Sequence, residues 1–352
     1  MIPHRLAEAR MRYLNKHCLM ILIVFFISPI NIEKVNAAPN GKLKVVTTLP
    51  VLKNLAEEIG GDKVQVEALA DPHEDPHFVQ PRPTLMKRGR EADAFIEIGL
   101  QLELWTENLI NGSGNLKIQK GQPGLIIAST NVPTLELPQS LSREWGDVHP
   151  YGNPHIWLDP INAKQITENI ANGFKAIDQA NAAYYEQRLA AFHHKIDDAL
   201  FGADLVREIG GSKLTRLARQ GKLLEYLKTR NLDDKLGGWL KKAEPLAGLK
   251  IISYHKTWVY FAQRFGFTIP LELEEKPGIE PSARHRDRVI ETMKAQNIKT
   301  ILVEQFYKRT AADYIAEQTG ARVVVVPIDV GSNASTPTYF DLIDYLIASL
   351  LP

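Results

Sequence analysis

Three histidines and one aspartate in this chain stand where they could bind one metal ion together. His77 and His155 each follow a proline, whereas His255 and Asp329 each end an apolar run. Imidazole nitrogens and carboxylate oxygens are ligands that zinc accepts, and three imidazoles with one carboxylate fill a tetrahedral shell. The chemistry that these four residues support is therefore the binding of a divalent ion such as zinc.

Each of the four residues taken alone has an ordinary structural explanation. A histidine beside a proline in a loop is more often a hydrogen-bonding residue than a ligand, because imidazole satisfies backbone groups well. An aspartate after an apolar strand is more often the cap of a turn or helix. The joint arrangement favours a metal site, because loops after strands converge at one edge of a parallel sheet and each half of the chain supplies two of the residues.

The elements that must position these residues alternate in the same order in both halves of the chain. Short β-rich runs alternate with amphipathic helical stretches, and such βα series build parallel sheets. In the first half, strands are predicted at 42–49, 64–69, 94–98 and 125–129, and helices at 51–59, 84–90 and 102–110. In the second half, strands are predicted at 249–254, 268–272 and 300–304, helices at 258–265, 284–295 and 311–319, and the segments 322–328 and 340–350 complete the series. We therefore expect an α/β protein with two βα lobes and parallel sheets.

A helical region is predicted between the two series. A long helical pattern at about 180–199 follows a shorter one that opens at Asp159 and Pro160, where aspartate can cap and proline fits the first turn. We interpret the long helix as a rigid strut that joins the lobes. Residues of about 202–247 fit neither series, because leucines recur there at roughly helical spacing among Arg and Lys, with Gly-Gly breaks. They predict a small inserted helical subdomain whose charged face is solvated.

The amino terminus has the order of residues of a secretory signal. Basic residues precede the apolar run 19–27, and small residues follow at 35–38. The run is short for a bilayer span, so a retained anchor is the weaker alternative. Met11 could serve as the start instead of Met1. The one cysteine, Cys18, lies in this segment, so the mature protein would have no thiolate zinc site and no cysteine catalysis.

The predicted boundaries follow from these patterns. They are a cleavable signal peptide at 1–38, an amino-terminal α/β lobe at 39–160, a helical segment with the strut at 161–201, the inserted subdomain at 202–247 and a carboxyl-terminal α/β lobe at 248–352. The 352 residues suffice for two hydrophobic cores, and 42 Lys and Arg against 41 Asp and Glu give a net charge of +1. No broad positive field therefore points to nucleic acid or to an anionic membrane surface.

Four blocks of sequence resemble one known family. These are Glu-Asp-Pro-His-Phe-Val-Gln-Pro at 74–81, Asn-Pro-His-Ile-Trp-Leu-Asp-Pro at 153–160, Ser-Tyr-His-Lys-Thr-Trp-Val-Tyr-Phe at 253–261 and Pro-Ile-Asp-Val at 327–330. In type and order they look like the ligand motifs of the metal-specific solute-binding proteins of ABC importers for zinc and manganese. The resemblance covers roughly 42–352, with the inserted helical stretch as the main departure.

The resemblance implies a fold, a site and a partner. Such proteins hold the metal at the interface of two lobes that a rigid helix joins, and they dock on a membrane permease. It assigns four ligands, His77, His155, His255 and Asp329. We therefore expect a monomeric periplasmic protein that captures Zn²⁺, with Mn²⁺ the less favoured ion, and delivers it to an ABC permease in the inner membrane. The long loop rich in His and Asp of many zinc-specific members is absent, and only Asp147, His149 and Asn153 mark the comparable region.

Other residues near these motifs receive lesser roles. His73 lies four residues before His77, but Pro76 interrupts a shared helical face, so we expect it outside the site. The pair 193–194 is expected at the surface. Trp157 and Trp258 either keep water from the site or simply fill the core.

An enzyme and an adhesin are the alternative functions. A zinc hydrolase needs an open coordination position and a general base, and the chain has no H-E-x-x-H motif, no G-x-S-x-G elbow and no phosphate-cradling glycine loop. We therefore expect no enzyme. A role in cell adhesion, as a surface protein that contains a structural metal, stays open, because the same scaffold could present its outside to a partner.

Overall fold

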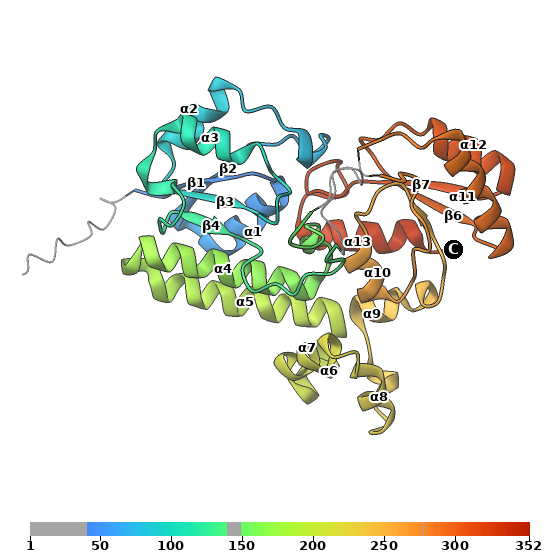
Figure 1. Ribbon diagram of the computed structural model, residues 1–352. Coiled ribbons are helices and arrows are strands. Elements are labelled where there is room, and N and C mark those ends of the chain that lie inside the picture. Colours follow the sequence, from blue (N-terminus) through green and yellow to red (C-terminus); the bar gives the residue numbers. More distant parts are fainter. Residues whose placement is uncertain (1–40, 139–148, 277) are drawn as a thin grey trace, which may run out of the picture. The chain divides into compact units, whose positions relative to one another are not determined.

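The computed structural model describes residues 41–138, 149–276 and 278–352 (Figure 1). The predicted signal peptide with Cys18 and the alternative start, and Asp147 farther along, lie outside these residues. Within the described ranges, no helix is both long enough and apolar enough to cross a membrane.

A parallel sheet of four strands forms the core of the first βα series. In spatial order its strands are β2 (Val64–Ala68), β1 (Leu43–Thr47), β3 (Ala94–Glu97) and β4 (Leu125–Ile127). Helices α1 (Pro50–Gly60) and α4 (Pro160–Ile177) cover one face, and α2 (Pro83–Glu91) and α3 (Thr106–Ser113) lie over the other (Figure 1). Because helices cover both faces, the apolar side chains of β3 are all buried.

A second parallel sheet forms the core of the other series. Its order is β5 (Ile252–Ser253), β6 (Thr300–Glu304) and β7 (Arg322–Val326). Helices α11 (Ala283–Ala295) and α12 (Thr310–Thr319) pack together, and α12 also contacts β6 and β7, while α13 (Tyr339–Leu350) contacts β7 as well. Helix α10 (Val259–Phe265) follows β5. The prediction of an α/β protein with two parallel-sheet lobes is confirmed.

Three predicted elements differ from the structure. The strand predicted at 249–254 is shorter, because β5 contains only Ile252–Ser253. The segment 268–272 forms only two isolated bridges, Lys250 with Thr268 and Ser253 with Glu272, because Pro270 has no N–H to give to a ladder. The helix predicted at 102–110 begins only at Thr106. Leu100 and Gln101 take positive φ values of 57° and 64°, so the chain turns before the helix can start.

Two long helices follow the first series along the chain, and the second of them contacts elements of both series. Helix α4 starts at Pro160 after Asp159, whose side chain accepts a hydrogen bond from the Ile161 N–H, as the sequence predicts. Helix α5 (Ala182–Phe201) packs along α4 and α1, and its Phe192 ring lies 5.8 Å from the ring of Phe340 in α13. It thus has the contacts of the predicted strut.

Short helices occupy the region predicted as an inserted subdomain. They are α6 (Ala203–Ile209), α7 (Gly211–Arg219), α8 (Leu223–Lys228) and α9 (Gly238–Lys242). Leu205, Leu214 and Leu227 are fully buried, whereas Leu224 is exposed. Helices α6, α7 and α9 pack on α5. The exact domain boundaries remain a prediction.

One buried acid makes the stability of the fold depend on pH. Glu304 ends β6 without solvent exposure, and its Oε1 accepts a hydrogen bond of 2.8 Å from the Trp258 indole. Oε2 has no hydrogen-bond partner among the described residues. Burial raises the pKa of Glu304 from 4.5 to about 8. The folded state therefore keeps this proton where the unfolded state releases it, and stability is lost as pH rises from about 4.5 through about 8.

We expect Glu304→Gln to remove this loss, because glutamine keeps the acceptor for Trp258 and has no proton to release. Between pH 5 and pH 9 the wild type should lose roughly a few kcal/mol relative to the variant, since one pKa unit corresponds to about 1.4 kcal/mol. Urea unfolding at the two pH values measures the difference. Glu317→Gln, at an exposed position of α12, is the matched control. Equal pH profiles for wild type and Glu304→Gln would contradict the assignment.

Candidate metal centre

His77 stands in a single 3-10 turn, Pro76–Phe78, whose first residue is a proline with φ suited to that position. The Asp75 Oδ1 accepts hydrogen bonds from the His77 N–H at 3.0 Å and from its Nδ1 at 2.7 Å. Local sequence therefore fixes both the turn and the ring. Because Nδ1 carries the proton toward the carboxylate, Nε2 is left with its lone pair.

His155 is held in the same way by Asn153. The Asn153 Oδ1 accepts from the His155 N–H and lies 3.0 Å from its Nδ1. The amide nitrogen of Asn153 donates to Glu136 and to the Lys256 carbonyl, so its oxygen is the acceptor for the ring. His155 is only 1% exposed, and its Nε2 is again the free nitrogen.

His255 follows β5 and is supported by an acid from farther along the chain. Its Nδ1 lies 2.8 Å from Glu274 Oε2, and both side chains are buried. A carboxylate on the remote ring nitrogen fixes the tautomer and makes the imidazole a stronger ligand. This partner was not predicted.

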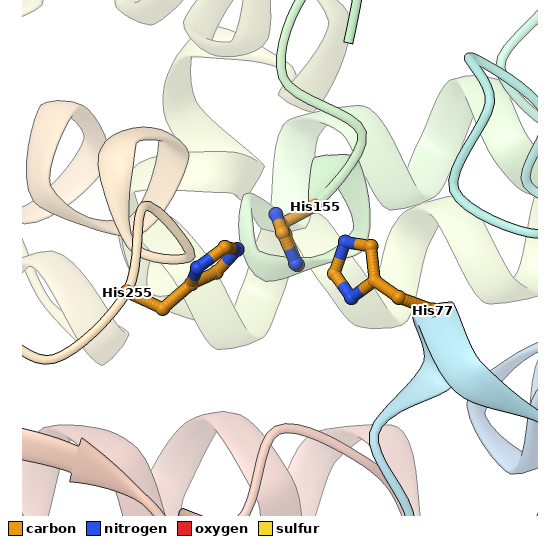
Figure 2. A group of neighbouring side chains, drawn as sticks. All are labelled: His77, His155 and His255. Carbon is orange, nitrogen blue, oxygen red and sulfur yellow. The ribbon is translucent and has the colours of Figure 1, made fainter. Parts of the chain in front are cut away.

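The three histidines converge on one point. One potential ligand atom of each lies within 4.8 Å of the others, and the three ring centroids are 5.4, 5.5 and 5.6 Å apart. Figure 2 shows the rings of His77, His155 and His255 facing a common space from three separate segments. Burial, followed by the charges of His77 and His255, lowers the pKa of His155 well below 6.5, so its ring is neutral at pH 7. Only a neutral ring binds metal, and the cluster is therefore suited to a cation.

Asp329 lies after β7 and is 6% exposed, but it is not in this three-histidine group. Its Oδ1 accepts hydrogen bonds from the Val51 N–H at 2.6 Å and the Val330 N–H at 2.8 Å. Val51 lies in the first turn of α1, where a helix has unpaired N–H groups that favour an anion. Burial raises the pKa of Asp329 to about 8. Among the described contacts, it has no hydrogen bond to the three histidines.

A fourth histidine lies beside the group. The Nε2 of His149 is 3.3 Å from the Nε2 of His77, and the two ring centroids are 5.3 Å apart. Burial lowers the pKa of His149 to about 3. Its only signal in the sequence was its place in the region comparable to the histidine-rich loop.

The remaining histidines and tryptophans lie outside the group or around it. His73 is 62% exposed and bonds to Asp71, as expected for a residue outside the site. His194 is exposed, but His193, expected at the surface, is half-buried with Nε2 at 3.0 Å from the Lys164 carbonyl. Trp157 and Trp258 are both fully buried. The Trp157 ring lies 5.4 Å from that of His155, and its N–H donates to the Ile328 carbonyl beside Asp329.

Comparison with known proteins shows which family this chain resembles. The chain matches the family described as ZnuA, zinc-uptake complex component A, periplasmic, over residues 45–200 and 228–351. The unmatched stretch between them carries α6 and α7 and most of α8.

Individual relatives differ in the metals of their names. The iron-binding protein YfeA of Yersinia pestis is 26% identical over 318 residues, which are 88% of this chain and 85% of YfeA. The manganese ABC transporter substrate-binding lipoprotein PsaA of Streptococcus mitis is 29% identical over 185 residues, which are 50% of this chain and 57% of PsaA. A crystal structure of ZnuA has the same fold, with a TM-score of 0.65 at 24% identity over 88% of this chain and 98% of that one.

Proposed function

This chain belongs to the ZnuA family of periplasmic metal-uptake components, and we propose from this premise that it captures Zn²⁺ in the periplasm and delivers it to an ABC permease. The family role is that of a metal-binding, substrate-binding component of an importer, and it is not enzymatic. The metal is thus cargo. The choice of zinc, the periplasmic location after cleavage of a signal, the inner-membrane permease and the monomeric state are parts of the proposal.

The observation that carries the proposal is the convergence of three imidazoles. Each has its Nδ1 bound to a side-chain oxygen, from Asp75, Asn153 or Glu274. Such partners orient a ring before the metal arrives. A site rich in imidazole nitrogen suits zinc, whereas manganese is better served by carboxylate and carbonyl oxygen. Zinc is therefore the favoured ion, and manganese, the metal in the name of PsaA, is the second candidate.

We propose His77, His155, His255 and Asp329 as the metal ligands. The first three are already grouped. Asp329 would bind through Oδ2, because the described hydrogen bonds to its carboxylate go to Oδ1. One of those bonds comes from α1 in the first series, and the other comes from the segment after β7 in the second series. The carboxylate would therefore be held by both series.

We expect one tightly bound zinc ion per chain, because one convergent ligand set is present. Elemental analysis of protein exported to the periplasm and purified without added metal measures the content. X-ray absorption should give ligand distances of about 2.0 to 2.2 Å, as zinc has with nitrogen and carboxylate oxygen. Two equivalent tight sites in calorimetry, or manganese in place of zinc after purification, would contradict the proposal.

A further inference from the structure

We propose that the inserted helices bind the surface of an anionic membrane through a group of unpaired basic side chains. This group, which we name the basic surface, consists of Arg216, Arg219, Lys222, Lys228 and Arg230. Such binding goes beyond the proposed function, because it needs no residue of the metal centre. It would keep the protein beside the membrane that holds the proposed permease.

The charge of the basic surface is local. The whole chain has a net charge of +1, but six basic residues stand against one acid, Glu225, between positions 211 and 230. All five members of the basic surface are exposed. None of them forms an ion pair with another described residue, whereas Lys235 nearby pairs with Glu208. A cluster of unpaired positive charges attracts an anionic partner.

The fold holds the basic surface in a fixed place. Helices α6 and α7 pack on α5, and α8 packs on α7 (Figure 1). A buried ion pair joins Lys164 of α4 to Asp197 of α5, with Nζ 2.7 Å from Oδ1. Thr215 of α7 donates a hydrogen bond of 3.0 Å to the same Oδ1. Helix α7 is therefore tied to both long helices, and the charges that it carries have a rigid support.

An exposed leucine within the basic surface indicates a lipid partner. Leu224 is 58% exposed on α8 and lies in the sequence between Lys222 and Lys228. Its neighbours Leu223 and Leu227 are buried, so α8 already has the apolar contacts that attach it to the fold. An apolar side chain among Lys and Arg is typical of segments that lie on anionic bilayers, where the apolar group enters the headgroup boundary.

The aromatic residue of α8 argues against an acidic protein as the partner. Protein interfaces usually depend on an accessible aromatic or arginine anchor that fits a pocket. Tyr226 is half-buried, with Lys213 Nζ 4.7 Å and Arg230 Cζ 4.9 Å from the centre of its ring. Its hydroxyl also bonds to Lys213 at 2.8 Å. The ring is thus engaged within the insert, and charges with one leucine are what the surface offers.

The family match does not assign a role to this surface. It covers residues 45–200 and 228–351, and the stretch between them carries Arg216, Arg219 and Lys222. Metal capture by the grouped histidines does not involve these residues. The basic surface is therefore a feature of this chain that metal binding leaves unexplained.

The test measures binding of the purified exported protein to vesicles of roughly three parts phosphatidylcholine and one part phosphatidylglycerol. The triple variant Arg216→Gln, Lys222→Gln, Lys228→Gln removes three exposed charges. We expect it to lose about 100-fold in vesicle affinity, because each basic residue near an anionic membrane contributes roughly fivefold. Wild-type binding should weaken as salt rises, and vesicles of phosphatidylcholine alone should bind no protein.

A second triple variant, Lys87→Gln, Lys120→Gln, Lys294→Gln, is the matched control, because it removes the same charge at three exposed positions outside the insert. It should bind the vesicles like the wild type. Equal losses in the two triple variants would overturn the proposal, since net charge alone would explain them. Wild-type protein that binds polyglutamate but not the vesicles would overturn it in favour of an acidic protein. Zinc titration of the same proteins tests the proposed function separately, and the zinc Kd should be equal in all three.

Discussion

His155→Ala should raise the zinc Kd by more than about 100-fold. Changing a residue that merely supports a metal ligand typically costs 10 to 100-fold in affinity, and loss of a ligand should exceed that range. His155 is the most buried of the grouped histidines, at 1% exposure, and alanine leaves no ligand atom at its place. Water entering the gap would be a weaker donor than the oriented imidazole.

The control for His155→Ala must separate the loss of a ligand from the loss of a buried ring. His285 is 3% exposed in α11 and bonds through Nε2 to the Glu272 carbonyl, outside the three-histidine group. His285→Ala should therefore destabilise the fold and leave zinc affinity within about 3-fold of the wild type, within the usual 2 to 3-fold spread of such effects. Titration of both folded variants with zinc in the presence of a competing chelator measures and compares their zinc affinities. Equal losses in the two would show that packing, and not coordination, explains the effect of His155.

Much of the fold was predictable because its signals are local. The runs of β3 and β6 are continuous and apolar, as expected for strands covered on both faces. Pro50 and Pro160 mark the first turns of α1 and α4. The late start of α3 was not predictable, since leucine and glutamine rarely adopt the positive φ values that Leu100 and Gln101 have and therefore do not signal a turn.

The parts of the site that were predicted also have local sequence signals, whereas the parts that were missed do not. Asp75 and Asn153 each lie two residues before their histidine, so a short side chain can hold both the turn and the ring, a pattern that sequence alone contains. Glu274 lies 19 residues after His255, and His149 lies 72 residues after His77. No local pattern joins such residues. Asp329 was proposed from its place after a strand, and its bond to Val51, 278 residues away, could not be foreseen.

His255→Glu should shift the zinc-to-manganese affinity ratio toward manganese by about 100-fold, the upper end of effects around metal ions. The reason is that imidazole suits zinc, whereas a carboxylate adds hard oxygen and bidentate contact, which suit manganese. Among the proposed ligands we choose His255 for this change, because it is buried and its ring already faces His77 and His155.

The structure adds a complication to this experiment. Glu274 lies 2.8 Å from the His255 ring, so a glutamate at 255 would stand near a second buried carboxylate. Two such carboxylates repel, and one of them takes up a proton unless a cation binds. Proton uptake would weaken both metals and hide part of the change in selectivity. The double variant His255→Glu with Glu274→Gln removes this repulsion and should recover manganese affinity.

Competition binding of zinc and manganese to the wild type, the single variant and the double variant measures the ratio directly. We expect the ratio to fall in both variants, with tighter manganese binding in the double variant than in the single one. Glu274→Gln alone is the remaining arm, and it should weaken zinc without favouring manganese, because its amide oxygen still accepts from the His255 Nδ1. A ratio that stays at the wild-type value in a folded double variant would mean that His255 does not contact the metal. The three-histidine centre would then have one ligand fewer. The main reason to favour zinc over manganese would also be lost.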